Sequence, residues 1–130
     1  MDFARVFPLS PGAPRQARQA LDELFGVVPP KVLIDLRIIV AELVTNSVKH
    51  SGGGEGEPIT LRVDCSDSVV RIEVEDGGPG FSPVFPAPNL ESAAGWGLYI
   101  VDRLADRWGT LSEGTVWAEV DLPDGGRMAS

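Results

Sequence analysis

Five stretches of the chain have the alternation or the composition of β-strands: 3–9, 59–65, 69–76, 108–111 and 115–122. Ser66-Asp67-Ser68 separates the second stretch from the third, and Ser112-Glu113-Gly114 separates the fourth from the fifth. Turns this short predict two β-hairpins. The first stretch alternates weakly and contains Pro8, which favours an edge strand because proline cannot donate a hydrogen bond to a neighbouring strand.

Three other stretches carry apolar residues at the three- and four-residue spacing of a helix. The first follows a turn at 10–14 and ends at Gly26, with its spaced residues at Ala17, Ala20, Leu21, Leu24 and Phe25. The second begins at Pro30, a residue suited to the first turn of a helix, and ends at His50-Ser51 before three glycines that can form a cap. The third opens at Gly95-Trp96-Gly97 and runs through Asp106.

Polar side chains form a line along the second predicted helix, whose other residues from Val32 to Val48 are mostly apolar. At ~100° per residue, Glu42 and Asn46 lie one turn apart and Lys49 returns to within roughly 20° of Glu42. Asp35 extends the line towards the N-terminus. A buried carboxylate or carboxamide needs a hydrogen-bond partner or a metal, so the line indicates the wall of a binding site. The alternative is a solvated face with pairs four residues apart.

The second strand of the first hairpin ends in a carboxylate on its apolar side. Asp76 has the same parity as Val70, Ile72 and Val74, whereas the charged residues between them have the opposite parity. Burial of a carboxylate is costly unless it accepts hydrogen bonds, and the glycines of Gly77-Gly78-Pro79-Gly80 let a ligand approach the backbone. We therefore expect Asp76 to bind a ligand. The alternative is a plain Asp-Gly turn.

A long loop and two glycines precede the third predicted helix. Residues 81–94 contain three prolines and show no helical or strand period, which is typical of a lid or binding loop. Gly95 and Gly97 follow at the helix start, where free N–H groups and the positive end of the helix dipole can hold an anion such as phosphate. A lone Gly-x-Gly is also common in ordinary loops.

Composition narrows the class of protein. With 130 residues, 43% of them hydrophobic, we expect one domain over 1–130, with a core of about 3–122 and a short tail. A net charge of -8 argues against a nucleic-acid partner. The one cysteine, Cys65, lies in a predicted strand and indicates a reducing compartment. No signal peptide or run of ~20 apolar residues is found, so we expect a soluble, cytoplasmic protein with no membrane partner.

Several motifs of nucleotide and hydrolase chemistry are missing from the sequence. No Gly-x-x-x-x-Gly-Lys-Ser/Thr occurs, and Gly95-Trp96-Gly97 follows a proline-rich loop where a dinucleotide fingerprint follows a strand. No cluster of cysteine and histidine could hold a metal, and a hydrolase triad would have to use His50 without a Gly-x-Ser-x-Gly turn. These observations exclude P-loop, Rossmann, zinc and triad sites.

The remaining motifs occur in a definite order: Glu42-x-x-x-Asn46 on a helix, Asp76-x-Gly78-x-Gly80 after a strand, Gly95-x-Gly97-Leu98 opening a helix, and Gly114-Thr115 beginning a strand. In this order the sequence resembles the GHKL ATPase superfamily, and within it the short anti-sigma factor and serine/threonine kinase branch. The resemblance covers nearly the whole chain. It implies a two-layer α/β sandwich of the Bergerat type, in which a mixed β-sheet carries helices on one face and ATP lies between the helices and a lid.

The resemblance also implies a role for each motif residue. Asp76 would accept from the adenine amino group, Asn46 would ligate Mg²⁺, and Glu42 would be the catalytic base for an attacking hydroxyl. The other implied nucleotide-binding positions are Gly78, Gly80, Gly95, Gly97, Leu98 and Thr115. Thr115 matches an adenine-side threonine by position, although simple alternation puts it on the same face as Trp117 and Glu119.

Two departures from the family pattern concern the phosphates. Relatives often carry arginine where this chain has Trp96, and no lysine or arginine occurs from Phe81 to Asp102. Phosphate charge would therefore be met by Mg²⁺, by backbone N–H groups, and by Lys49 or Arg103.

The implied function is that of an ATP-dependent serine/threonine protein kinase and anti-sigma factor, which binds a sigma factor and phosphorylates an antagonist (anti-anti-sigma) protein. Members of the branch dimerise, so a homodimer is expected, with the 3–9 edge in its interface. The alternatives are a non-catalytic ATP-binding interaction module, which Trp96 favours, and a bare ATP hydrolase. A histidine kinase would need an acceptor on another chain, because His50 lies in the site helix.

Overall fold

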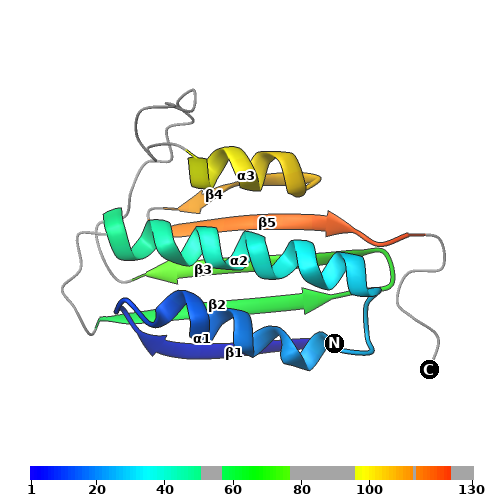
Figure 1. Cartoon of the computed structure of the whole chain (residues 1–130), viewed down its shortest axis with the longest axis horizontal. Helices are drawn as coiled ribbons and strands as arrows, with labels where there is room; N and C mark the ends of the chain where they lie inside the picture. The colour runs from blue at the N-terminus through cyan, green and yellow to red at the C-terminus, as the bar shows by residue number, and fades with distance from the viewer. Residues whose placement is uncertain (51–56, 77–95, 113, 124–130) are drawn as a thin grey trace.

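The computed structural model describes residues 1–50, 57–76, 96–112 and 114–123. The elements follow one another (Figure 1) as β1 (Asp2–Pro8), α1 (Ala13–Ala20), the 3-10 helix η1 (Leu21–Leu24), α2 (Pro30–His50), β2 (Pro58–Cys65), β3 (Val69–Asp76), α3 (Trp96–Leu104), β4 (Arg107–Ser112) and β5 (Thr115–Asp121). Each predicted strand and helix is present, and the first predicted helix is divided into α1 and η1. The predicted loop at 81–94 lies outside the described residues.

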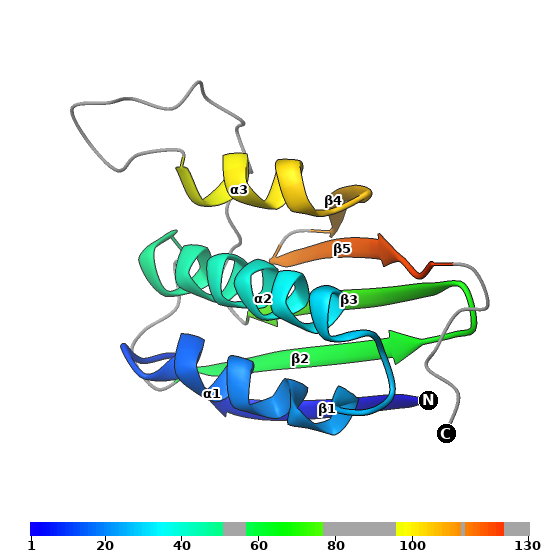
Figure 2. The ribbon, with the colours of Figure 1, turned by 45° about the vertical axis from the view of Figure 1, so that its right-hand side comes forward.

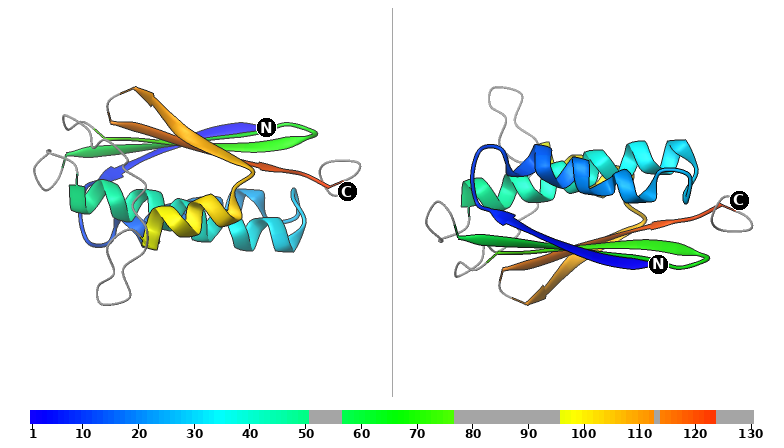
Figure 3. Two further views of the ribbon diagram at one scale, coloured as in Figure 1. Left: turned by 90° about the horizontal axis from the view of Figure 1, so that it is seen from above. Right: turned by 90° about the horizontal axis from the view of Figure 1, so that it is seen from below.

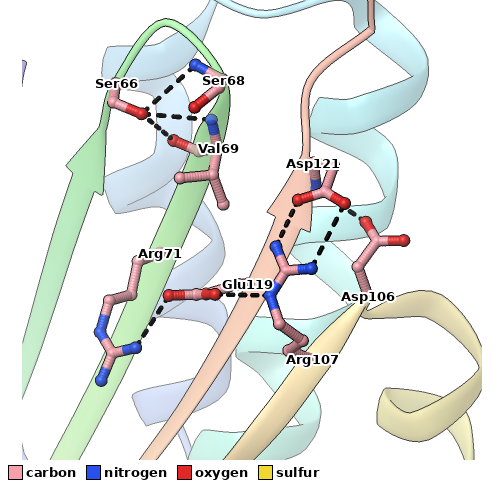
Figure 4. Close-up of polar contacts among 8 residues, drawn as sticks. All are labelled: Ser66, Ser68, Val69, Arg71, Asp106, Arg107, Glu119 and Asp121. Carbon is pink, nitrogen blue, oxygen red and sulfur yellow. Dashed lines mark hydrogen bonds and ion pairs between the residues drawn. The ribbon is translucent and has the colours of Figure 1, made fainter.

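The five strands form one sheet in the order β1-β2-β3-β5-β4, and each neighbouring pair is antiparallel. The expected mixed sheet is therefore wrong, whereas the two-layer sandwich is confirmed because the helices cover one face (Figures 2 and 3). Tight turns join β2 to β3 and β4 to β5, which requires antiparallel pairing. In the first turn, the Ser66 hydroxyl accepts from the N–H groups of Ser68 and Val69 at 3.3 and 3.2 Å (Figure 4).

The core lies between the sheet and the helix layer. Every second residue of β2 and β3 is buried, as the alternation predicts, and Cys65 is one of them. α2 lies between α1 and α3 in the helix layer (Figure 2) and contributes the fully buried side chains of Leu36, Ile39, Val40, Leu43 and Val44. Burial of each such side chain stabilises the fold by ~1.5–3 kcal/mol, so α2 is firmly anchored.

The edge strand β1 is tied to β2, its neighbour among the described strands. The backbone N–H of Cys65 donates to the carbonyl of Met1 at 2.7 Å. Phe7 is buried against the helices, whereas Val6 is 66% exposed on the other face. The edge position predicted for 3–9 is confirmed. In the described part of the chain, no helix has both the length and the apolar character that a membrane crossing needs.

The face of the sheet away from the helices carries a network of ion pairs across β3, β5 and β4 (Figure 4). Glu119 accepts from Arg71 at 2.9 Å and from Arg107 at 2.8 Å. Arg107 also pairs with Asp121. The guanidinium of Arg71 stacks over the ring of Trp117, 4.4 Å from its centroid. The outer face is therefore held together by side chains from three strands.

These contacts shift the titration of two carboxylates. Hydrogen bonds from Arg107, and then from Arg71, hold the pKa of Glu119 below its ordinary value. A hydrogen bond from Arg107 likewise lowers the pKa of Asp121. Since the pKa is lower in the folded state than in the unfolded chain, each carboxylate stabilises the fold above its ordinary pKa. That contribution is lost as the pH falls through the folded-state pKa.

Glu119→Gln should lower the free energy of unfolding by up to ~1 kcal/mol at pH 7, because two guanidinium groups lose their shared carboxylate. As the pH falls below the ordinary pKa of glutamate, the parent protein loses the contribution of Glu119, so the difference between variant and parent should shrink at pH 3. Urea unfolding at both pH values measures it. Asp64→Asn, which changes an exposed carboxylate of β2, is the control. A difference that is as large at pH 3 as at pH 7 would contradict the assignment.

Candidate functional site

Four segments that are far apart in the sequence meet at one end of the molecule. Figure 1 shows the C-terminal end of α2, the end of β3, the start of α3 and the start of β5 on the same side. Glu42 and Asn46 lie on α2, Asp76 on β3 and Gly97 on α3. We call these four residues the candidate site. The fold therefore brings the separate motifs to one region.

Within the candidate site, Gly97 of α3 lies close to Glu42 and Asn46 of α2. A Cβ atom built on Gly97 would lie 2.8 Å from Glu42 Oε2 and 3.5 Å from Asn46 Oδ1. Glu42 and Asn46 are each only partly exposed, so a fully solvated face is wrong for these two residues. Lys49 is exposed, and Asp35, which is also only partly exposed, pairs with Lys31 at 3.3 Å, four residues away.

The side-chain amide of Asn46 has a buried hydrogen-bond donor without an acceptor among the described residues. Its Nδ2 atom is buried and has no hydrogen-bond partner among the residues that the structure describes. A buried polar group in this state costs about 1–3 kcal/mol, and a ligand that reaches it would remove that cost. Rotation of the amide about its last bond exchanges its donor and its acceptor, so this position can serve either kind of ligand atom.

Asp76 lies where its parity predicts. It is 6% exposed and continues the buried face of β3. Its backbone N–H donates to the carbonyl of Gly114 at 2.9 Å, which ties the end of β3 to the start of β5. The role of Gly114 was not predicted from the sequence. Its φ of 79° explains why glycine stands there, and the signal was a glycine directly before a strand.

The other predicted site residues fall into two groups. Leu98, next to Gly97, is 7% exposed and Thr115, at the start of β5, is 3% exposed, so both are buried. Thr115 lies opposite Glu75, and its hydroxyl donates to Glu75 Oε2 at 3.5 Å. Thr115 therefore has the parity of Trp117 and Glu119, as alternation predicts. Gly78, Gly80 and Gly95 lie outside the described residues.

The candidate site has the chemistry to hold a nucleotide with Mg²⁺. Within the described ranges, no three histidine, cysteine, aspartate or glutamate side chains gather into a metal cage. Mg²⁺ commonly takes only one or two ligands from the protein and completes its shell with phosphate oxygens and water. A single carboxamide oxygen from Asn46 is therefore sufficient. Asp76 adds an acceptor for a base, and Glu42 adds a carboxylate one turn from Asn46.

Three relatives of the chain carry informative names. The chain is 31% identical over 96 residues, 65% of its length, to an anti-sigma F factor of Pasteuria penetrans, and it spans 64% of that protein. It is 32% identical over 84 residues, 55% of its length, to the serine-protein kinase RsbW of Listeria innocua, and spans 54% of it. It is 29% identical over 84 residues, 55% of its length, to the sensor histidine kinase YxdK of Bacillus subtilis, and spans 26% of it.

A family model extends this likeness over most of the chain. Residues 7–118 match the histidine kinase-like ATPase domain. The match begins in β1 and ends in β5, so it includes all four motifs and each strand of the sheet. The chain therefore belongs to the histidine kinase-like ATPase domain family.

Proposed function

We propose that residues 1–130 work as one ATP-binding domain, an anti-sigma factor with serine/threonine kinase activity towards an antagonist protein. One observation carries this proposal. The backbone of Gly97 lies against both Glu42 and Asn46, which joins the first motif to the third. A phosphoryl-transfer site needs a metal ligand, a base and a close-approaching backbone in one place, and the proximity of Asn46, Glu42 and Gly97 supports those roles for them.

Each residue of the candidate site has a proposed task. Asp76 accepts a hydrogen bond from the adenine amino group, and Asn46 offers an oxygen ligand to Mg²⁺. When bound, MgATP supplies the phosphoryl group with its charge partly neutralised. Glu42 takes the proton of an attacking serine or threonine hydroxyl. We also propose nucleotide-binding roles for the remaining predicted positions, Gly78, Gly80, Gly95, Leu98 and Thr115.

The names of the relatives support a kinase that regulates a sigma factor. One is an anti-sigma F factor and another a serine-protein kinase, and both are spanned further than the sensor histidine kinase. We therefore propose a sigma factor and an antagonist protein as partners, and a cytoplasmic location to meet them. The net charge of -8 favours protein partners over nucleic acid. The second candidate is a non-catalytic ATP-binding module, which Trp96 in place of arginine favours.

MgATP at ~100 times its dissociation constant should stabilise the protein by roughly 2.7 kcal/mol, a rise of a few degrees in melting temperature. Asp76→Asn should abolish the rise, because the carboxylate that accepts from adenine becomes an amide. Thermal melts with and without MgATP measure both effects. Asp64→Asn is the matched control and should keep the rise, since Asp64 is exposed on β2. No shift with either ATP or ADP would exclude nucleotide binding.

Glu42→Ala should keep ATP binding and lose phosphoryl transfer by about 10²- to 10⁴-fold, the usual contribution of a general base. Asn46→Ala should lose both, because the metal would no longer have its ligand from α2. Titration with nucleotide and transfer from labelled ATP to the antagonist protein separate the two effects. Glu57→Ala, an exposed glutamate outside the candidate site, should change neither. Transfer at the parental rate in Glu42→Ala would favour the binding module.

The protein should form a homodimer through the free edge of β1. Outside its pairing with β2, this strand has no neighbour within the described sheet, and Val6 is 66% exposed beside that edge. Open edges with apolar side chains favour pairing with another chain. Light scattering at micromolar concentration should give twice the monomer mass, and Val6→Asp should reduce it. A parent protein that is monomeric under these conditions would refute the dimer.

A further inference from the structure

Gly97 lies in the first turn of α3, where its backbone does not require glycine. The described glycines with positive φ are Gly26 and Gly114, so Gly97 has a conformation open to any residue. Glycine in a helix costs roughly 0.5–1 kcal/mol relative to alanine, because it loses more backbone freedom on folding. Backbone geometry therefore does not explain the glycine. We consider instead the space that a side chain at this position would occupy.

The space beside Gly97 is taken by the carboxylate of Glu42. A Cβ atom at Gly97 would lie 2.8 Å from Glu42 Oε2, closer than a methyl group and a carboxylate oxygen can approach without moving. The two atoms of the Asn46 amide would lie at 3.5 and 3.7 Å, which is ordinary van der Waals contact. Of these atoms, only the carboxylate oxygen would have to leave its present position to admit a side chain at residue 97.

α3 has little freedom to move away from α2 and make room. Leu98 is 7% exposed and Val101 is completely buried, so both anchor α3 in the core. Beyond the helix, the backbone N–H of Ala105 donates to the carbonyl of Val101, and that of Asp106 to the carbonyl of Glu119 on β5, each at 2.8 Å. A side chain at position 97 would therefore have to displace the Glu42 carboxylate and leave α3 in place.

We propose that Gly97 is a positioning residue for Glu42: the missing side chain leaves the space in which the carboxylate lies beside the first turn of α3. That turn has no acidic residue of its own, so Glu42 supplies the negative charge that the N-terminal end of a helix favours. The inference rests on the proposed function in one respect only, namely that Glu42 is the base. The steric relation between the two residues is independent of any nucleotide.

A double-mutant cycle on the protein without nucleotide tests that relation. Gly97→Ala should have a less favourable effect on the melting temperature when Glu42 is present than when it is absent, because the new methyl group displaces the carboxylate from the first turn of α3. In the Glu42→Ala background the same substitution should be neutral or should raise the melting temperature, because alanine is the better helix former. A shift of the same sign and size in both backgrounds would overturn the proposal.

Gly109→Ala is the matched control for this cycle. A Cβ atom at Gly109 would lie 3.3 Å from the ring of Trp117, on the outer face of the sheet, so it tests crowding that does not involve Glu42. Its effect on the melting temperature should be the same in both backgrounds. If the effect of Gly109→Ala also depended on Glu42, the coupling would not be specific to Gly97 and the proposal would fall.

The second test asks whether Gly97 acts on the base or on the nucleotide. If it positions Glu42, Gly97→Ala should reduce kcat for phosphoryl transfer by up to the ~10²-fold expected of a base out of place, while KM for ATP changes far less. If it serves only the phosphates, Gly97→Ala should weaken ATP binding equally in the parent and in the Glu42→Ala background, which would overturn the proposal. Absence of ATP binding by the parent would instead refute the proposed function.

Discussion

The close contact between α2 and α3 is the constraint on which the candidate site depends. Here Gly97 of α3 lies beside Asn46 and so close to Glu42 that an added methyl group would displace the Glu42 carboxylate. The contact is possible because the large side chains of α2 are buried under the sheet and fix the helix along its length. Packing at one side of α2 thereby sets the position of the polar groups at another side.

The sheet carries a further polar group of the candidate site, Asp76, on the face that the helices cover. β3 carries its alternation through to Asp76, and the carbonyl of Gly114 holds the end of that strand against β5. Burial of the Asp76 carboxylate at this strand end is costly, because it removes the group from water. The ion pairs of Arg71, Glu119 and Arg107 join the three strands on the opposite face. The sheet, joined across its outer face by these ion pairs, therefore carries Asp76 on the face towards the helices.

Much of this architecture could be predicted from local patterns, and the limits have physical causes. Strand alternation predicted the burial of Asp76 and placed Cys65 in a strand, because the period of two is a property of each strand alone. The two hairpins were predicted from their short turns, but the pairing of β1 with β2 and of β3 with β5 depends on which strands meet, so the full order and direction of the sheet could not be predicted. The polar line on α2 could be read from the sequence. Which of its residues lie against another helix depends on where α3 packs, and this could not be read from the sequence. Glu42 and Asn46 contact α3, whereas Asp35 forms a local pair with Lys31.

The pairing of β1 with β2 has a consequence for the order of folding. The hydrogen bond from the amino group of Met1 to the carbonyl of Cys65 joins residues 64 positions apart, whereas the hairpin of β2 and β3 closes through a short turn. Long-range contacts pay a larger loop-closure entropy and generally form later. We therefore expect the hairpin to form early and β1 to dock last. Amide hydrogens of the edge strand should then exchange with solvent sooner than those of β3.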